Sequence, residues 1–262
     1  MVTFPKLGLN FNINPSINIG TLEIRWYALF IVTGMILAVA FSIWEGKRIG
    51  VSSDTILDVA LISIPSAIIG ARIYYVIFSI DSYDNFWDML KIWEGGLAIY
   101  GGVIAGVAAG LIYLHKKKIS KGKVSDLAGM GFLIGQSIGR WGNFMNGEAY
   151  GGPTDLPWGM IIQGETFVAV HPTFLYESIW NIFGFVLLFF YRKYKKFDGE
   201  IFLLYIVWYG MGRTWIEGLR ADSLYIWATN IRVSQLLALL AVVGGVIIIF
   251  YKRYKLHKAK TE

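Results

Sequence analysis

The chain has 262 residues, of which 55% are hydrophobic and only 16% are charged, and it contains no cysteine. This composition is typical of an integral membrane protein, and the lack of cysteine excludes both a disulfide scaffold and a thiol nucleophile of its own. The net charge of +6 lies mostly in short basic segments between apolar runs, so it favours contact with anionic lipid and not with nucleic acid.

Apolar runs follow one another along the chain, and a spanning helix needs about 20 such residues. In chain order the runs are 26–44, 56–80, 95–114, 124–143, 174–191, 201–218 and 233–251. Some are interrupted by one or two polar residues. We therefore expect an all-α polytopic membrane protein of about seven transmembrane helices, forming a single domain over residues 1–262.

Lysine and arginine are concentrated in alternate connections, and basic loops remain on the cytoplasmic side of a membrane. The strongly basic segments are 115–123, 192–196 and 252–258, whereas 81–88 and 145–171 contain neither residue. This pattern predicts an N-terminus outside and a C-terminus in the cytoplasm. The long connection 145–171 has apolar residues on both sides of Gly164-Glu-Thr166, so we expect an external cap loop with a short hairpin.

Polar side chains within the apolar runs lie mainly in the outer half of this topology. A charged side chain near the bilayer centre costs roughly 2.5–3.5 kcal/mol, so a cluster of them indicates a functional site. Guanidinium groups match phosphate oxygens with two hydrogen bonds, which favours an anionic ligand at this leaflet. For Arg25 and Arg232, at the ends of runs, interfacial snorkelling is the alternative.

Glycine recurs at every fourth position in two of the runs. The residues are Gly102, Gly106 and Gly110 in the third run, and Gly131, Gly135 and Gly139 in the fourth. Small residues at this spacing let helices approach closely in lipid. We therefore expect the third and fourth helices to pack directly and to hold Tyr100 near Arg140.

The densest polar motif is Gly139-Arg-Trp-Gly-Asn-Phe-Met-Asn-Gly-Glu148, at the end of the fourth run. It resembles the signature of the prolipoprotein diacylglyceryl transferase family. Four further segments are similar to that family's pattern: Arg25-Trp-Tyr27, Gly70-Ala-Arg72, His171-Pro-Thr-Phe-Leu-Tyr-Glu177 and Gly212-Arg-Thr-Trp-Ile-Glu-Gly-Leu-Arg220. The resemblance covers roughly residues 22–240. It departs at Tyr100, where many family members have histidine.

The resemblance implies an enzyme of the bacterial plasma membrane with its active site toward the outer leaflet. Such an enzyme transfers the diacylglyceryl group of phosphatidylglycerol to the lipobox cysteine in the signal peptide of a preprolipoprotein. A thioether forms and glycerol phosphate is released. Its partners would be these two substrates and membrane lipids, and it would need no metal and no cofactor.

This reaction gives the motif residues expected roles. The phosphate leaves as an anion, and positioned arginines would stabilise it in a low-dielectric pocket, so we expect Arg140 and Arg213 to hold it. Glu148 and Glu217 would either fix these arginines or accept the thiol proton. The remaining expected site residues are Tyr27 and Tyr100 as site-lining hydroxyls, Asn143, Asn146 and Arg72 as ligands of the lipid, Gly151 for close backbone approach, and His171 as a base or as the cap of the fifth helix.

Two other classes of function fit parts of the sequence. A secondary transporter of an organic phosphate would also need arginines, although transporters generally show repeated halves with polar breaks near the midplane. A non-enzymatic lipid-binding subunit would not need asparagine and glutamate beside the arginines. A transfer assay separates the three.

Overall fold

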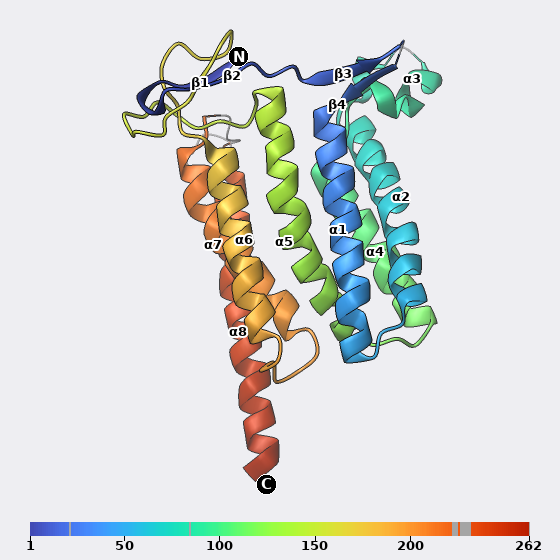
Figure 1. Cartoon of the computed structure of the whole chain (residues 1–262). Helices are drawn as coiled ribbons and strands as arrows, with labels where there is room; N and C mark the ends of the chain where they lie inside the picture. The colour runs from blue at the N-terminus through green and yellow to red at the C-terminus, as the bar shows by residue number, and fades with distance from the viewer. Residues whose placement is uncertain (21, 84, 222–224, 226–231, 262) are drawn as a thin grey trace. The chain divides into compact units, whose positions relative to one another are not determined.

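The computed structural model of the chain describes residues 1–20, 22–83, 85–221, 225 and 232–261 (Figure 1). It is mostly helical. The described residues include seven helices of 18 residues or more: α1 (Trp26–Ile49), α2 (Ser53–Phe78), α4 (Ile99–Lys116), α5 (Lys121–Asn146), α6 (Thr173–Tyr191), α7 (Glu200–Leu219) and α8 (Val233–Thr261). A five-residue helix, α3 (Phe86–Leu90), and three 3-10 turns, η1 (Pro5–Leu7), η2 (Ile80–Ser82) and η3 (Ile92–Glu94), complete the helical elements.

Five of the helices, α1, α2, α4, α6 and α8, are long and apolar enough to cross a membrane. This agrees with an all-α polytopic membrane protein. The other two long helices, α5 and α7, do not meet this measure, and they carry Arg140 and Arg213. The third run begins as helix at Ile99 and not at residue 95, because Gly95 and Gly96 adopt positive φ angles of 92° and 69°.

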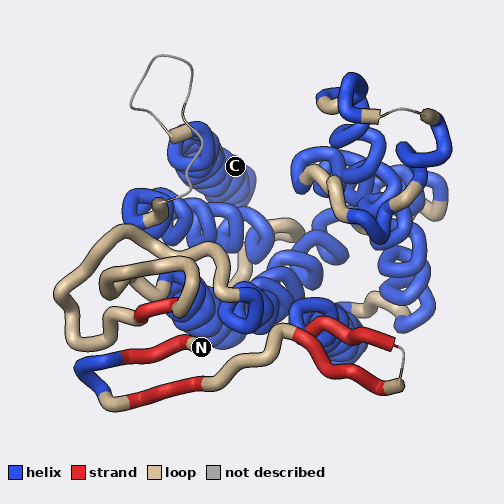
Figure 2. Tube along the Cα trace, turned by 90° about the horizontal axis from the view of Figure 1, so that it is seen from above, coloured by secondary structure: helices blue, strands red, loops and turns tan. Residues whose placement is uncertain are grey.

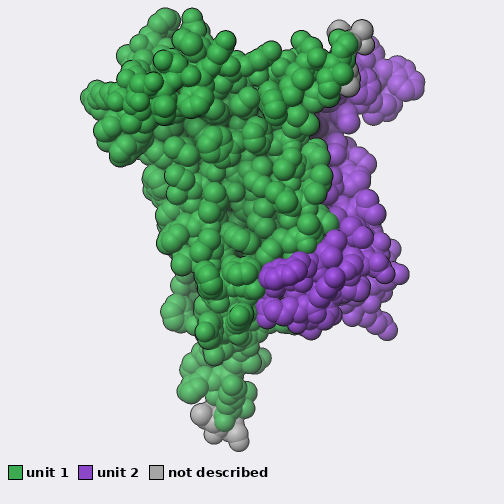
Figure 3. Space-filling view, in the orientation of Figure 1, with its two compact units in different colours: residues 1–42, 125–262 green, residues 43–124 purple. Residues whose placement is uncertain are grey.

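The chain divides into two compact units, residues 1–42 with 125–262, and residues 43–124 (Figure 3). In the smaller unit, α2 and α4 pack through small residues. A Cβ on Gly110 would lie 2.8 Å from Ser63 Oγ, and one on Gly106 would lie 3.1 Å from Ala67 Cβ. The glycines of α4 therefore allow close approach to α2.

The glycines of α5 have a different partner. In the larger unit, a Cβ on Gly131 would lie 3.4 Å from Ala38 Cβ, and one on Gly135 would lie 3.9 Å from the carbonyl oxygen of Gly34, both on α1. The expectation that the two glycine rows join the third helix to the fourth is therefore wrong. Each row finds its own small-residue partner, on α2 or on α1, and glycine spacing alone does not name that partner.

An N-terminal β-structure was not expected from the sequence. The strands are β1 (Val2–Phe4), β2 (Leu9–Phe11), β3 (Ser16–Ile19), β4 (Leu22–Arg25) and β5 (Ile161–Ile162). The first, second and fifth form an antiparallel sheet in the order β2-β1-β5, and β3 pairs with β4. Figure 2 shows the N-terminal segment running beside the loop that precedes α6. The cap is therefore built from two separate parts of the chain.

The hairpin expected within 145–171 is only one residue pair long. Met160 and Val170 exchange two backbone hydrogen bonds, of 3.0 and 2.8 Å, but Ile161–Ile162 pairs with β1. The reason lies in the turn that follows, where Ile162 donates its N–H to Thr166 Oγ1 at 2.9 Å and accepts from the N–H of Thr166 at 2.8 Å. The N–H and the carbonyl of Ile162 are therefore already bonded within the turn and do not extend the hairpin.

Helices α6 and α7 are joined by a reciprocal pair of tryptophans. Each indole N–H, of Trp180 and of Trp208, donates to the backbone carbonyl of the other residue at 3.0 Å, and the rings stack with centroids 4.3 Å apart. Each ring lies against a glycine of the opposite helix, Trp180 against Gly212 and Trp208 against Gly184. This packing fixes the spacing of the two helices.

We expect Gly184→Ala to lower stability by about 1–3 kcal/mol, because the added methyl would overlap the Trp208 indole and must displace it. The measurement is the thermal unfolding midpoint in detergent. Gly244→Ala, in α8, is the matched control, since nothing lies within 4 Å of its Cβ position. An unchanged midpoint for Gly184→Ala would show that the tryptophan pair does not set the helix spacing.

Candidate active site

Three charged residues of the motifs meet at one end of the helices of the larger unit. Arg140 lies within about two turns of the end of α5, Arg213 within about two turns of the end of α7, and Glu177 in the second turn of α6. Because α6 runs between the other two in sequence and in the opposite direction, its beginning meets their ends. The expected convergence of Arg140 and Arg213 is therefore seen in the fold.

Glu177 is the centre of this cluster. Its Oε2 lies 2.5 Å from Arg140 Nη2, and its Oε1 lies 3.1 Å from Arg213 Nη1 and 3.9 Å from Arg220 Nη1. One carboxylate thus links guanidinium groups from α5 and α7. Since each oxygen contacts a different helix, Glu177 fixes the distance between the two arginines.

Glu217 supports the second arginine from its own helix. Its Oε2 lies 2.6 Å from Arg213 Nη2, at the i,i+4 spacing that places side chains on one helical face. Arg232 donates to the backbone carbonyl of Glu217 and also contacts the Tyr225 hydroxyl, at 3.3 Å from its Nε. Of the two expected roles for Glu217, fixing an arginine is the one seen in these contacts.

The two asparagines connect Arg140 to Glu148. Asn143 Oδ1 accepts from Arg140 Nη1 at 3.2 Å, and Asn143 Nδ2 donates to Glu148 Oε1 at 2.9 Å. Asn146 Nδ2 donates to the same oxygen at 3.3 Å. Hydrogen bonds and ion pairs therefore run without interruption from Glu217 to Asn146. Within this row of contacts, Glu148 is exposed and Glu217 is buried.

The arginines of the cluster are partly exposed, whereas the carboxylates that pair with them are buried. The side chains of Arg140, Arg213 and Arg220 are 20%, 19% and 13% exposed, whereas those of Glu177 and Glu217 are 5% and 3% exposed. Arginine N–H groups are therefore accessible to an approaching anion. Such a site suits a phosphate, since guanidinium donors form short, charge-assisted hydrogen bonds with its oxygens.

Gly151 lies beside this cluster, where three segments of the chain come together. Its N–H donates to the carbonyl of His171 at 2.9 Å, and a Cβ here would lie 2.6 Å from His171 Cβ and 2.8 Å from the carbonyl oxygen of Leu219. The close backbone approach expected at Gly151 is thus found between protein segments. The approach of a lipid to this glycine stays a prediction.

His171 takes part in a second polar group at the beginning of α6. Its Nδ1 lies 3.2 Å from the hydroxyl of Tyr176, which accepts from Trp158 Nε1 at 2.7 Å. Because the tyrosine already accepts from the indole, its own proton is available for His171 Nδ1. Burial lowers the pKa of His171, so the imidazole is neutral at pH 7.

The tyrosines of the expected site lie in different units. Tyr27, at the beginning of α1, packs on the α5 backbone, since a Cβ on Gly142 would lie 2.9 Å from its ring. It is therefore next to the helical turn that carries Arg140 and Asn143. Tyr100, in α4 of the smaller unit, is 43% exposed.

Arg72 is buried in the smaller unit and is bound by backbone carbonyls. Its Nε donates to Met89 at 2.7 Å, its Nη2 to Asp88 at 2.8 Å, and its Nη1 to Gly95 and Gly96 at 2.6 and 3.1 Å. A guanidinium group has five N–H donors, and four of them bind carbonyls of α3 and of the segment between α3 and α4. These contacts give Arg72 a structural role in the segment that precedes α4.

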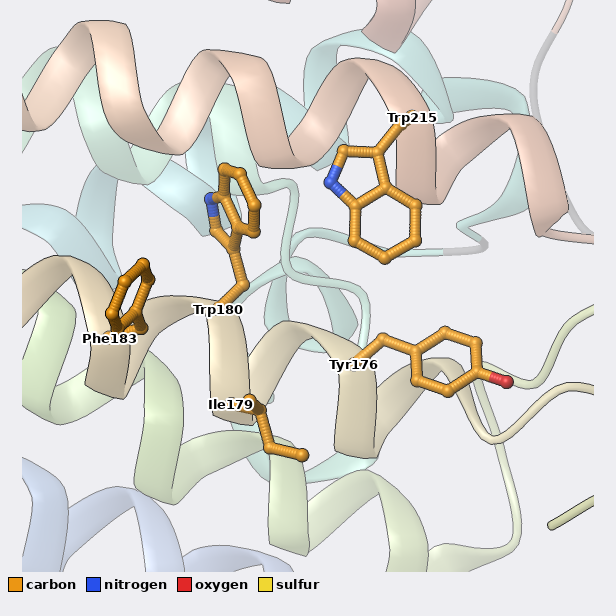
Figure 4. Close-up of a pocket in the computed structure, with 5 residues that line it drawn as sticks. All are labelled: Tyr176, Ile179, Trp180, Phe183 and Trp215. Carbon is orange, nitrogen blue, oxygen red and sulfur yellow. The ribbon is translucent and has the colours of Figure 1, made fainter.

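An apolar pocket of 220 Å³ is formed by side chains of α6 and α7 (Figure 4). It is lined by Tyr176, Ile179, Trp180, Phe183 and Trp215. The indole N–H of Trp180 is already bonded to a carbonyl, so the pocket presents mainly hydrocarbon and aromatic surface. Such a surface accepts apolar chains and offers little to a polar ligand.

Sequence reasoning did not select Glu177 and Arg220 as site residues, although both belong to the matched motifs. Glu177 ends the His171 motif and Arg220 ends the Gly212 motif. A signal was present in the charges, because two outer arginines without a shared carboxylate would repel each other at this depth. Counting arginines against glutamates at the same leaflet would have pointed to Glu177.

Comparisons with known proteins agree with the motifs. A family model described as prolipoprotein diacylglyceryl transferase matches residues 15–251. A Clostridioides difficile (strain 630) protein named phosphatidylglycerol--prolipoprotein diacylglyceryl transferase is 46% identical over 227 residues, which cover 86% of this chain and 90% of that protein.

Two further relatives have the same name. One from Oceanobacillus iheyensis is 44% identical over 252 residues, covering 91% of this chain and 87% of its own length. One from Streptococcus pyogenes serotype M5 (strain Manfredo) is 44% identical over 253 residues, covering 92% and 96%. The match thus extends over nearly the whole chain, and the protein belongs to the prolipoprotein diacylglyceryl transferase family.

Proposed function

We propose that this protein transfers the diacylglyceryl group of phosphatidylglycerol to the lipobox cysteine of a preprolipoprotein. The observation that carries the proposal is the pair of partly exposed arginines, Arg140 and Arg213, held by one buried carboxylate in a chain of this family. The thiolate sulfur forms a bond to the glyceryl carbon, and the carbon–oxygen bond to phosphate breaks. Glycerol phosphate leaves with that electron pair, and the thiol proton passes to a base.

In this proposal Arg140 and Arg213 hold the phosphate, and Asn143 and Asn146 orient oxygens of the headgroup. Fixed donors stabilise the charge that develops on the leaving phosphate without reorganisation, and loss of one such donor typically costs about 100- to 1,000-fold in rate. Glu148 is the better candidate for accepting the thiol proton, because it is exposed and its side-chain hydrogen bonds with the described residues come from neutral amides.

The proposal also includes the topology. All seven long helices span the bacterial plasma membrane as a single domain, with the N-terminus and the arginine cluster toward the outer leaflet and the C-terminus in the cytoplasm. The cap and the arginines lie at one end of α6 and α7, and the basic segment 192–196 lies at the other end of α6. This arrangement supports an inward-facing basic end.

A transfer assay with purified protein tests the function. We expect conversion of a lipobox peptide and phosphatidylglycerol into a thioether-linked product without added metal or nucleotide. Loss of activity in a chelator, restored by a divalent cation, would contradict this mechanism. Exclusive use of a zwitterionic donor lipid, transport without transfer, or lipid binding without transfer would each contradict the proposal.

The hydroxyl of Tyr100 is expected to orient lipid and not to transfer protons, because a phenol is a weak base at neutral pH. Tyr100→His should therefore be tolerated, and Tyr100→Phe should keep substantial turnover, since one hydrogen bond contributes about 1 kcal/mol net. The measurement is the transfer rate of each variant. If Tyr100→Phe folds and binds lipid but loses several orders of magnitude in rate, Tyr100 moves protons.

A further inference from the structure

The charge of the arginine cluster matches the substrate of the proposed reaction and not its product. Among the described residues, the linked group contains four arginines and three glutamates, which leaves one positive charge. They are Arg140, Arg213, Arg220, Arg232, Glu148, Glu177 and Glu217. The phosphodiester of phosphatidylglycerol carries a single negative charge, so lipid binding balances the charge of these seven residues.

The reaction changes the charge of the phosphate. When the carbon–oxygen bond breaks, the phosphodiester becomes a phosphomonoester that carries about 1.5 to 2 negative charges at pH 7, since its second pKa is near 6. The thiol loses its proton at the same time, so charge is conserved over the whole reaction. The product phosphate thus carries more negative charge than the cluster neutralises.

We propose that Glu177 is a specificity-determining residue whose charge limits the affinity of the cluster for phosphomonoesters and so promotes release of glycerol phosphate. The inference rests on the proposed function. Glu177 is buried, contacts guanidinium groups with both oxygens, and is less exposed than the arginines it contacts. Its negative charge therefore acts on the bound phosphate through the two arginines that hold it.

Glu217 contacts Arg213 through its side chain, and Glu148 is joined to Arg140 through Asn143. Glu177 is thus the carboxylate placed to act on both phosphate-holding groups at once. Replacing it with the isosteric, neutral glutamine keeps an acceptor oxygen for the arginines and raises the net charge of the group by one.

The test compares two soluble ligands, glycerol phosphate as the monoester and glycerophosphoglycerol as the diester, by calorimetry with full-length protein in detergent. In Glu177→Gln, the preference for the monoester over the diester should increase by about tenfold relative to the unaltered protein, because two nearby charges attract a dianion more than a monoanion. This increase should grow between about pH 5.5 and 7.5, as the monoester loses its second proton.

Arg220→Gln supplies the opposite change, since it removes one positive charge 3.9 Å from Glu177 Oε1. Here the preference for the monoester should fall by about tenfold. A purely structural role for Glu177 would weaken both ligands alike and leave their ratio unchanged. The inference is overturned if Glu177→Gln leaves the ratio unchanged, or if the unaltered protein binds neither ligand.

The same variants separate this inference from the proposed function. If the unaltered protein transfers lipid but Glu177→Gln leaves the ligand ratio unchanged, only the inference fails. If the ratio changes as expected but no transfer is detected, the charge control stands and the transferase function fails. In an active Glu177→Gln variant, glycerol phosphate should inhibit transfer about tenfold more strongly than in the unaltered protein.

Discussion

Replacing either Arg140 or Arg213 with lysine should lower the transfer rate by about 100- to 1,000-fold. Lysine keeps the positive charge but loses the planar fork of donors. In the structure each of these arginines contacts one carboxylate oxygen of Glu177. Arg140 also bonds Asn143, and Arg213 also pairs with Glu217. An ammonium group cannot keep these contacts and bind a phosphate in the same geometry. The measurement is thioether formation by each variant, with membrane insertion and abundance followed in parallel.

Arg48→Lys is the matched control for this loss. Arg48 also pairs with a buried glutamate, Glu45, but its side chain is 40% exposed and it belongs to the smaller unit. We expect its activity to be near normal. Arg25→Lys should also be better tolerated than either cluster variant. If both cluster variants keep most of their activity, two-point binding of the phosphate by the guanidinium groups is wrong.

Arg72→Met should be the most destabilising of these substitutions, by about 3–5 kcal/mol, because it leaves the carbonyl groups of four residues without their donor. The effect should be concentrated in residues 85–98. Hydrogen exchange of these amides should accelerate, while amides of α6 and α7 keep their protection. A denaturant titration of the purified protein gives the size of the loss.

Lys91→Met serves as the control in the same segment, since its ion pair with Asp88 is partly exposed and such pairs contribute about 0–1 kcal/mol. Little change is expected for it. The motif resemblance makes a different prediction for Arg72, namely that it binds lipid. Unchanged exchange in 85–98 together with lost phosphatidylglycerol binding in Arg72→Met would support that role.

The long helices were predictable because their signal is local. In a membrane, an apolar run of about 20 residues satisfies its backbone hydrogen bonds by forming a helix. The convergence of Arg140 and Arg213 was predictable for a related reason, since alternating helix directions place the end of one run beside the end of the next but one. Asn143 followed from its position one turn beyond Arg140.

The parts that sequence did not predict depend on partners far apart in the chain. The pairing of Val2 with Ile162 in the cap joins segments about 160 residues apart, and no local pattern encodes it. The glycine rows indicated close packing but not whether α1, α2 or another helix was the partner. Arg72 was expected to bind the lipid because it belongs to a matched motif. Its contacts with Gly95 and Gly96 instead depend on a turn that local sequence does not specify.

The central claim is that Arg140 and Arg213 together hold the phosphate of an anionic lipid. A structure of the protein with bound phosphatidylglycerol tests it most directly. The account predicts phosphate oxygens within about 3 Å of guanidinium nitrogens of both arginines, with Glu177 still bonded behind them. Phosphate bound elsewhere, beside Arg72 or the basic segment 192–196, with none at Arg140 and Arg213, would contradict it.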